Sequence, residues 1–202
     1  MEIKKKKLTN EQIKDIISKF KKEKKIRIYT PIKYFKGLTK EKDVIERLNE
    51  FVRNKNNNYE YDKVSFQTDK IPVHSRKPSK YTKLFMERFG GKDASIEMSD
   101  EIKSKLTGVP LRIIETVKRK GFGAYNSGHR VGVSAQAWAN ARVNSFLTLG
   151  CAALTADEKL LYEVYQMRKS KKREKFFNQP ISCDNKKKKI PEYLINGKYK
   201  KK

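Results

Sequence analysis

The sequence predicts a mainly α-helical protein, a compact small helical domain with basic extended arms at both ends. Three observations lead to this fold class. Apolar residues recur at the three- and four-residue spacing of an amphipathic helix along much of the chain. Serine, threonine or asparagine precedes most of these segments, and glycine follows several, as expected at helix ends. Finally, 49 of the 202 residues are Lys or Arg against 23 acidic residues, and lysine runs lie near both ends.

The N-terminal portion, residues 1–65, is expected to be basic and to contain two helices. The first spans 10–22 after Thr9 or Asn10, and its apolar residues lie on one side. The second spans 40–54. A minor β component near this portion is left open, because a two-stranded ribbon is only marginally stable alone. The weakly alternating segments that would form it are 26–30 and 59–67.

Residues 66–167 are expected to form the compact helical domain. Ser79, Ser99 and Ser134 are placed to cap helices, and Thr155 with Glu158 has the spacing of a capping box. Eight of the nine alanines lie between 124 and 156, so helices are expected to approach closely there. The expected helices are 80–89, 100–106, 111–120 ending at Gly121, the one capped by Ser134 that runs to Leu149 and ends at Gly150, and a last one after the capping box that carries Leu160, Leu161, Val164 and Tyr165.

The C-terminal tail, residues 168–202, is expected to be an extended arm that stays disordered until it binds a partner. It carries 14 basic residues against three acidic ones, together with two prolines and the run Lys186–Lys189. Runs of like charge repel one another and oppose folding into a core.

The formal net charge of +26 is the strongest indication of function. Such a charge opposes compaction and favours a polyanionic partner. An anionic membrane surface is the alternative, since 10–22 pairs a basic face with an apolar face, but docking on a core explains that stripe equally well. No apolar run is long enough to span a bilayer. We therefore expect nucleic acid as the partner, and no membrane.

The residues that often carry catalysis or metals form no recognisable pattern. Cys151 and Cys183 are too few for a disulfide framework, so a reducing compartment is expected. Cys151 lies among glycine and alanine, a setting typical of a buried inert thiol, which disfavours a nucleophilic pair with His129. The two histidines, His74 and His129, make no zinc spacing with the cysteines. We expect no catalytic residue, no metal, no cofactor and no small-molecule substrate.

Residues 99–119 have the pattern of a helix-turn-helix element. Ser104 lies four residues before Gly108, where the chain would reverse between two packed helices. If the second helix enters a major groove, Arg112 and Glu115 near its start would meet base edges. The basic residues that follow would contact phosphates: Lys118, Arg119 and Lys120. Two helices joined by a tight turn without groove contact are the alternative, because such motifs also occur by chance.

Residues 120–146 contain a second candidate anion site. No acidic residue occurs between Glu115 and Asp157, so the basic residues there are expected to be uncompensated. His129 and Arg130 precede a helix whose free first-turn amides favour anions, and Arg142 lies further along it. Arginine forks suit two roles equally: they hold a phosphate, or they hydrogen-bond loop carbonyls and join the turn to the core.

The aromatic residues of this segment, Trp138 and Phe146, are interpreted as core rather than as a base-stacking platform, because their helix is rich in alanine. The complete set of predicted nucleic-acid-binding residues is Arg112, Lys118, Arg119, Lys120, His129, Arg130, Arg142, Lys186, Lys187, Lys188 and Lys189.

Residues 32–167 also resemble an uncharacterised domain carried by nucleocytoplasmic large DNA viruses and by tailed phages. Two positions depart from the family pattern: Val131 stands where proline is more frequent, and Tyr125 where tryptophan is frequent. The motifs that carry the resemblance are Tyr34-Phe35-Lys36-Gly37-Leu38-Thr39, Lys77-Pro78-Ser79 with Tyr81-Thr82 and Phe85, Thr107-Gly108-Val109-Pro110, Lys120-Gly121, Ala124-Tyr125, Gly128-His129-Arg130 with Gly132, Gln136, Trp138, Ala141-Arg142-Val143, Ser145-Phe146 and Ala156-Asp157.

The resemblance implies a virus-encoded protein made in the host cytoplasm or a viral factory, and it implies no mechanism. Together with the charge, it leads us to expect a non-enzymatic, virion-associated nucleic-acid-binding protein that contacts mainly phosphates, with DNA favoured over RNA. The alternative is a minor capsid or cementing protein whose basic arms order on other shell proteins. An enzyme acting on nucleic acid is disfavoured, because its magnesium would need a cluster of carboxylates.

Overall fold

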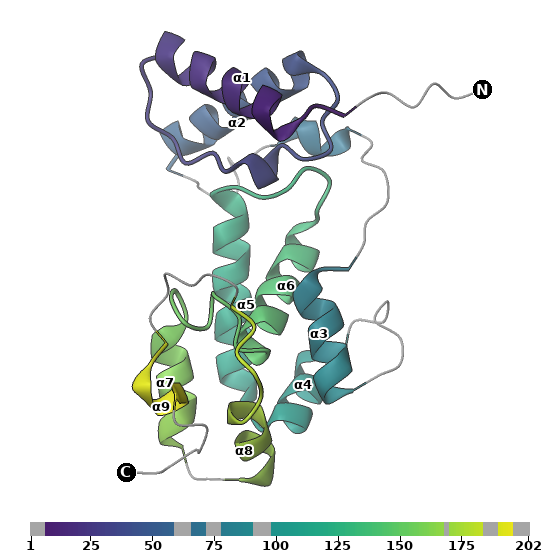
Figure 1. The fold of residues 1–202 in the computed structure, drawn as a ribbon, viewed down its shortest axis with the longest axis vertical. Coiled ribbons are helices and arrows are strands. Elements are labelled where there is room, and N and C mark those ends of the chain that lie inside the picture. Colours follow the sequence, from purple (N-terminus) through teal and green to yellow (C-terminus); the bar gives the residue numbers. More distant parts are fainter. Residues whose placement is uncertain are drawn as a thin grey trace, which may run out of the picture. The chain divides into compact units, whose positions relative to one another are not determined.

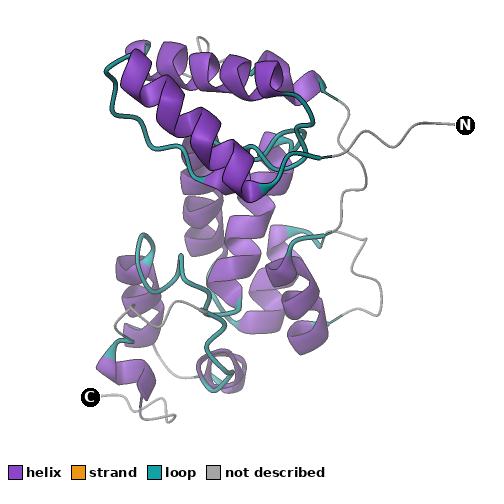
Figure 2. Ribbon diagram, turned by 45° about the horizontal axis from the view of Figure 1, so that its top comes forward, coloured by secondary structure: helices purple, strands orange, loops and turns teal. Residues whose placement is uncertain are grey.

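The computed structural model describes residues 7–58, 66–71, 78–90, 98–167, 170–183 and 190–195. The described residues are mainly helical and contain no strand, as Figure 2 shows. The chain divides into two compact units: unit 1 comprises residues 1–76 and 122–138, and unit 2 comprises residues 77–121 and 139–202. Mainly α architecture is therefore confirmed. The units differ from the expected ranges, because 122–138 groups with the N-terminal portion.

Unit 1 is built around two helices that pack against each other, α1 (Asn10–Glu23) and α2 (Glu41–Asn56), labelled in Figure 1. Thr9 and Gln12 form a capping box at the start of α1. The expected apolar stripe of α1 is buried in a core shared with Val44, Leu48 and Phe51 of α2. Residues 26–30 form no strand, and most of the segment expected to pair with them, 59–65, lies outside the described residues. Two short 3₁₀ turns complete the unit, η1 (Ile32–Tyr34) and η2 (Gln67–Lys70).

Unit 2 is a helical bundle with its own core. Ser79 and Ser99 cap their helices as predicted, each accepting a hydrogen bond from a backbone amide three residues ahead. The apolar core includes Phe85, Ile113 and Phe146, all almost completely buried. Two helices have residues in both units, α5 (Leu111–Asn126) and α6 (Ala135–Leu147). The other helices are α3 (Lys80–Phe89), α4 (Asp100–Thr107), α7 (Glu158–Gln166), α8 (Lys171–Phe177) and α9 (Glu192–Ile195).

Two predicted helix ends are wrong. α5 continues past Gly121, which marks a close helix approach instead of a stop: a Cβ at Gly121 would lie 2.7 Å from the Cα of Ala139. The expected capping box of α7 is not formed. Its cap position is Asp157, and the Thr155 hydroxyl donates to the carbonyl of Cys151. No described helix is long and apolar enough to cross a membrane.

The prediction of an extended arm from residue 168 is wrong for 170–183, which fold onto unit 2. Phe176 and Phe177 of α8 are buried in its core, and burial of apolar surface outweighs the repulsion among neighbouring lysines. Arg88 donates hydrogen bonds to Gln179 and to the carbonyl of Pro180, at 2.9 and 2.8 Å. Residues 168–169, 184–189 and 196–202 of the tail lie outside the described residues.

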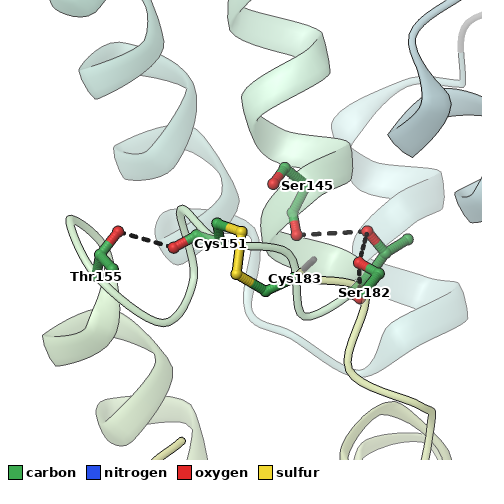
Figure 3. The surroundings of a disulfide bond; sticks show 6 residues. Ser145, Cys151, Thr155, Ser182 and Cys183 are labelled. Carbon is green, nitrogen blue, oxygen red and sulfur yellow. Dashed lines mark hydrogen bonds between the residues drawn. A yellow bond between two sulfur atoms is a disulfide. The ribbon is translucent and has the colours of Figure 1, made fainter. Parts of the chain in front are cut away.

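A disulfide joins Cys151 to Cys183 and corrects the prediction of free, inert thiols (Figure 3). Cys151 lies in the turn after α6, and Cys183 ends the segment that follows α8. Beside the bridge, the Ser182 amide donates to Leu149 and its hydroxyl donates to the Thr148 carbonyl, at 3.1 and 2.7 Å. The returning segment is therefore held by a backbone and a side-chain hydrogen bond as well as by the covalent bond.

Candidate nucleic-acid interface

The segment between α1 and α2 concentrates positive charge on the surface of unit 1. Residues 24–40, which we call the basic loop, contain six basic residues and no acidic one. All six are exposed, and none forms an ion pair with a carboxylate of the described residues. They are Lys24, Lys25, Arg27, Lys33, Lys36 and Lys40.

Apolar anchors hold the backbone of the basic loop in place. Pro31 starts the 3₁₀ turn η1, and Tyr34, Phe35 and Leu38 are buried in the core of unit 1. Backbone hydrogen bonds run from the amides of Phe35 and Leu38 to carbonyls three residues earlier. Because the anchors point inward, the basic side chains between them project from an ordered backbone into water.

Gly128 packs against Tyr34 of η1, and so brings Arg130 close to the basic loop. Its φ of +142° is a conformation that glycine adopts readily, and a Cβ there would lie 2.8 Å from the Tyr34 ring and 2.5 Å from the Phe51 ring. Two residues later Arg130 is exposed. The pKa of Lys33 is lowered, first by burial and then by the positive charge of Arg130, so the two cations are close enough to repel. A bound anion would relieve that repulsion.

A buried polar network fixes the loop that carries Arg130. Its centre is the Asp69 carboxylate, whose Oδ2 accepts hydrogen bonds from His129 Nε2 at 2.6 Å and from the Tyr125 hydroxyl at 3.2 Å. Oδ1 accepts from Arg47 at 2.8 Å and from the amide of Gly132 at 3.3 Å. Arg47 also donates to the carbonyl of His129 at 2.8 Å. The loop is thus held immediately before and after Arg130, which presents its guanidinium from a constrained backbone.

The polar groups of the network are paired with one another. Both ring nitrogens of His129 lie within hydrogen-bond distance of oxygen atoms, Nε2 at 2.6 Å from the Asp69 carboxylate and Nδ1 at 3.0 Å from the Tyr125 carbonyl. Arg47 lies 3.8 Å from Glu50, whose carboxylate accepts from the Thr68 amide and hydroxyl. Arg47 therefore meets two carboxylates, those of Glu50 and Asp69. Burial alone would raise the pKa of Asp69. The His129 hydrogen bond and the Arg47 charge outweigh burial, so the pKa of Asp69 lies below its ordinary value.

His129, predicted to hold a phosphate, is instead an interior residue. Its side chain has no exposed surface, its ring stacks on Tyr125 with centroids 3.5 Å apart, and both nitrogens are occupied. Nothing in the sequence around His129 signals this, because Asp69 lies 60 residues away along the chain.

Arg142 and Lys120 in unit 2 share one buried carboxylate. Arg142 donates two hydrogen bonds to Asp157, at 3.0 and 2.8 Å, and Lys120 lies 3.3 Å from the same side chain. The expectation that these cations are uncompensated is therefore wrong. Of the two roles left open for Arg142, the contacts favour the structural one, with a carboxylate as the partner in place of loop carbonyls.

The helix-turn-helix segment consists of α4 and α5, and Gly108 between them adopts φ +72°. Its turn is covered, since Arg173 of α8 donates to the Gly108 carbonyl at 3.2 Å. Two of its predicted contact residues have acidic partners: Arg112 lies 2.5 Å from Glu163, and Lys118 lies 2.6 Å from Asp100.

Two of the predicted contact residues, Arg119 and Arg130, are exposed and have no ion pair among the described residues. Lys186, Lys187, Lys188 and Lys189 lie outside the described residues. Trp138 and Phe146 pack into the two cores, as interpreted from the sequence. Within the described part of the chain, no group of His, Cys, Asp or Glu is suited to hold a metal ion.

The sequence interpretation missed the basic loop, although a signal was present. No acidic residue occurs between Glu23 and Glu41, a gap as readable as the one between Glu115 and Asp157. The two gaps differ in the folded protein. The Asp157 carboxylate pairs with Arg142 and Lys120, which lie in the second gap, whereas no carboxylate of the described residues pairs with the basic loop.

The fold and the site together define a small, mainly helical protein with a buried charged network beneath an exposed basic surface. Residues 31–161 match the model of a family of unknown function, DUF5824, and the chain belongs to that family. No curated protein and no solved structure matches the chain. The matched range includes the polar network, Lys33, Arg130 and the Arg142–Asp157 pair.

Proposed function

We propose that this is a non-enzymatic nucleic-acid-binding protein that contacts phosphates through the basic loop and Arg130. One observation carries the proposal: Lys33 and Arg130 are exposed and have no ion pair among the described residues, and the close packing of Gly128 on Tyr34 brings their backbone segments together. Binding a phosphate between them removes their mutual repulsion and releases counterions from the nucleic acid. The rest of the basic loop extends the positive surface for a longer polyanion.

DNA is the favoured nucleic acid, and a virus-encoded, virion-associated protein made in the host cytoplasm or viral factory is the proposed setting. The resemblance of the Gly128-His129-Arg130 region to a domain of DNA viruses supports both points. A non-enzymatic role is supported by the cysteine and histidine side chains of the described residues. Cys151 is held in a disulfide, and His129 is buried with both nitrogens occupied.

The test is the salt dependence of binding to a duplex DNA oligonucleotide, measured by fluorescence anisotropy. For duplex DNA the logarithm of the affinity falls with the logarithm of salt by about 0.9 per phosphate neutralised. Replacing three cations of the proposed site should therefore reduce that slope by up to about 3 and weaken binding at low salt. The variant is Arg27→Gln with Lys33→Gln and Arg130→Gln.

A matched control removes the same charge from exposed lysines that each neighbour an acidic residue in sequence: Lys14→Gln with Lys42→Gln and Lys159→Gln. We expect a smaller change in slope for the control. Equal slopes for the two triple variants would refute the site, and an affinity that is nearly flat with salt would refute nucleic-acid binding. Retention of the protein with emptied shells after nuclease and high salt would instead favour the capsid role.

A further inference from the structure

We propose that the basic loop binds an unpaired nucleic-acid strand, with the Tyr29 ring stacked on a base and Arg27, Lys33 and Arg130 holding the flanking phosphates. The inference rests on the proposed function and narrows it from nucleic acid in general to single-stranded segments.

Tyr29 is the most exposed large hydrophobic side chain in the described part of the chain, with 76% of its surface accessible. Its segment is extended and alternates: Ile28 packs against the core of unit 1 and Thr30 is buried, whereas Arg27 and Tyr29 are exposed. Successive side chains of an extended segment point to opposite sides, so Arg27 and Tyr29 share the outward side.

The segment that carries Tyr29 is fixed at both ends. The Lys55 ammonium donates a hydrogen bond to the Arg27 carbonyl at 2.9 Å, and the Tyr34 amide donates to the Pro31 carbonyl at 2.9 Å. Exposing a tyrosine ring to water on an anchored backbone forgoes the stabilisation that burying it would give. A ligand that covers the ring explains that placement.

Tyr34 connects the exposed ring with the two cations. The Lys33 ammonium lies 5.3 Å from the centroid of the Tyr34 ring, and the rings of Tyr34 and Phe51 fill the space beside Gly128, two residues before Arg130. The pKa of Tyr34 is raised to about 12, first by burial and then by the nearby Tyr29, while the charge of Arg130 opposes the rise. Lys33 and the loop of Arg130 therefore contact the same buried ring, and Tyr29 lies five residues before it on the anchored segment.

This combination suits a single strand better than a duplex. Bases within a duplex are covered on both faces by their neighbours, whereas an unpaired base can expose a face to an aromatic side chain. Stacking of this kind tolerates any base, so the inference predicts little sequence preference. Phosphates on either side of the stacked base are within the reach of long Lys and Arg side chains.

The chain offers a matched control in Tyr162, an exposed tyrosine of α7 with 48% of its surface accessible. It neighbours Glu163 in sequence and its ring lies near Tyr165 and Tyr193, with centroids 6.2 and 5.5 Å away. Tyr162 lies outside the basic loop, and its neighbour Glu163 pairs with Arg112, so removing the Tyr162 ring should not affect binding at the proposed site.

The experiment measures the affinity of the full chain for a fluorescent oligonucleotide of deoxythymidine, one of uridine and a DNA duplex of equal length. The variants are Tyr29→Ala, Tyr29→Trp and Tyr162→Ala, with far-UV circular dichroism to establish that each is folded. We expect Tyr29→Ala to weaken single-strand binding about ten-fold, and duplex binding much less. Tyr29→Trp should retain the affinity and show quenching of its fluorescence when the single strand binds.

The outcomes separate stacking at Tyr29 from nucleic-acid binding in general. Equal losses on single strand and duplex for Tyr29→Ala, or an equal loss for Tyr162→Ala, would overturn stacking at Tyr29 while salt-dependent binding to duplex still supported the proposed function. Absence of binding to all three oligonucleotides would overturn the proposed function itself. Comparison of the deoxythymidine and uridine oligonucleotides identifies which backbone the site prefers.

Discussion

Removing the Cys151–Cys183 disulfide should destabilise unit 2 without abolishing its fold. The bridge closes a loop of the chain between residues 32 positions apart. In the chain-entropy treatment, a crosslink over a loop of that length removes unfolded-state entropy equivalent to about 3–4 kcal/mol at 25 °C. The buried side chains of Phe176 and Phe177 stay in place after reduction, because their packing does not depend on the covalent bond. The loss should therefore appear in stability and less in the native structure.

The assay is urea denaturation followed by far-UV circular dichroism, for the oxidised protein, the protein in excess reductant and the variant Cys151→Ser with Cys183→Ser. Reduction and double substitution should lower the unfolding free energy by the same amount, and lower the Tm by on the order of 10 °C. Trypsin should also cleave sooner near the exposed Lys171 and Lys172. Two titratable thiols in native protein purified without reductant, or an unchanged midpoint on reduction, would refute the reasoning.

Three further predictions concern the buried charges and the tight turn. Gly128→Ala should cost at least about 2 kcal/mol in urea denaturation, because a Cβ meets the Tyr34 and Phe51 rings at positive φ; an unchanged midpoint would contradict the close approach. Asp157→Asn should cost about 3 kcal/mol, since Arg142 loses its buried partner, and this would be measured by thermal denaturation. The pKa of Asp69 is lowered in the folded state. The stabilisation that ionised Asp69 contributes to the folded state should therefore be fully present above the pKa of an unfolded aspartate, about 4. It should be lost as the pH falls through the lower pKa of the folded state. The difference in unfolding free energy between the wild type and Asp69→Asn should therefore become smaller as the pH is lowered from 7 to 3.

The helices could be predicted from sequence wherever their signals were local. The caps at Thr9, Ser79 and Ser99 lie within three residues of the amides they bind, and all three are confirmed. Gly121 failed as a stop signal because its role is set by Ala139 on another helix. A glycine at a close helix contact and a glycine at a helix end look the same in a single sequence.

The tail shows how composition can mislead over a short segment. Its 14 basic residues favoured an extended arm, yet Phe176 and Phe177 are enough to dock α8 on the core of unit 2. The disulfide could not be predicted for a similar reason. Pairing of two cysteines depends on their separation in space, and that is set by the return of residues 178–183 to the C-terminal end of α6.

The candidate site depends on which carboxylates remain available, and this is a property of the folded chain. The two acidic residues of the network that fixes the Arg130 loop are Asp69 and Glu50, and both already lie beside Arg47. Asp69 also hydrogen-bonds with His129. If Asp69 paired with Arg130 instead, the buried Arg47 would lose a carboxylate partner, at a cost of several kcal/mol.

The Asp69 network therefore fixes the loop that carries Arg130, and the charge of Arg130 has no carboxylate partner among the described residues. In unit 2 the single carboxylate of Asp157 serves Arg142 and Lys120 together, so the same kind of gap in the sequence there yields an internal ion pair. A stretch without acidic residues predicts an anion site only where the folded protein supplies no carboxylate from elsewhere in the chain. Among the described residues, the basic loop with Arg130 meets that condition, and this is why we place the phosphate contacts there and not at Arg142.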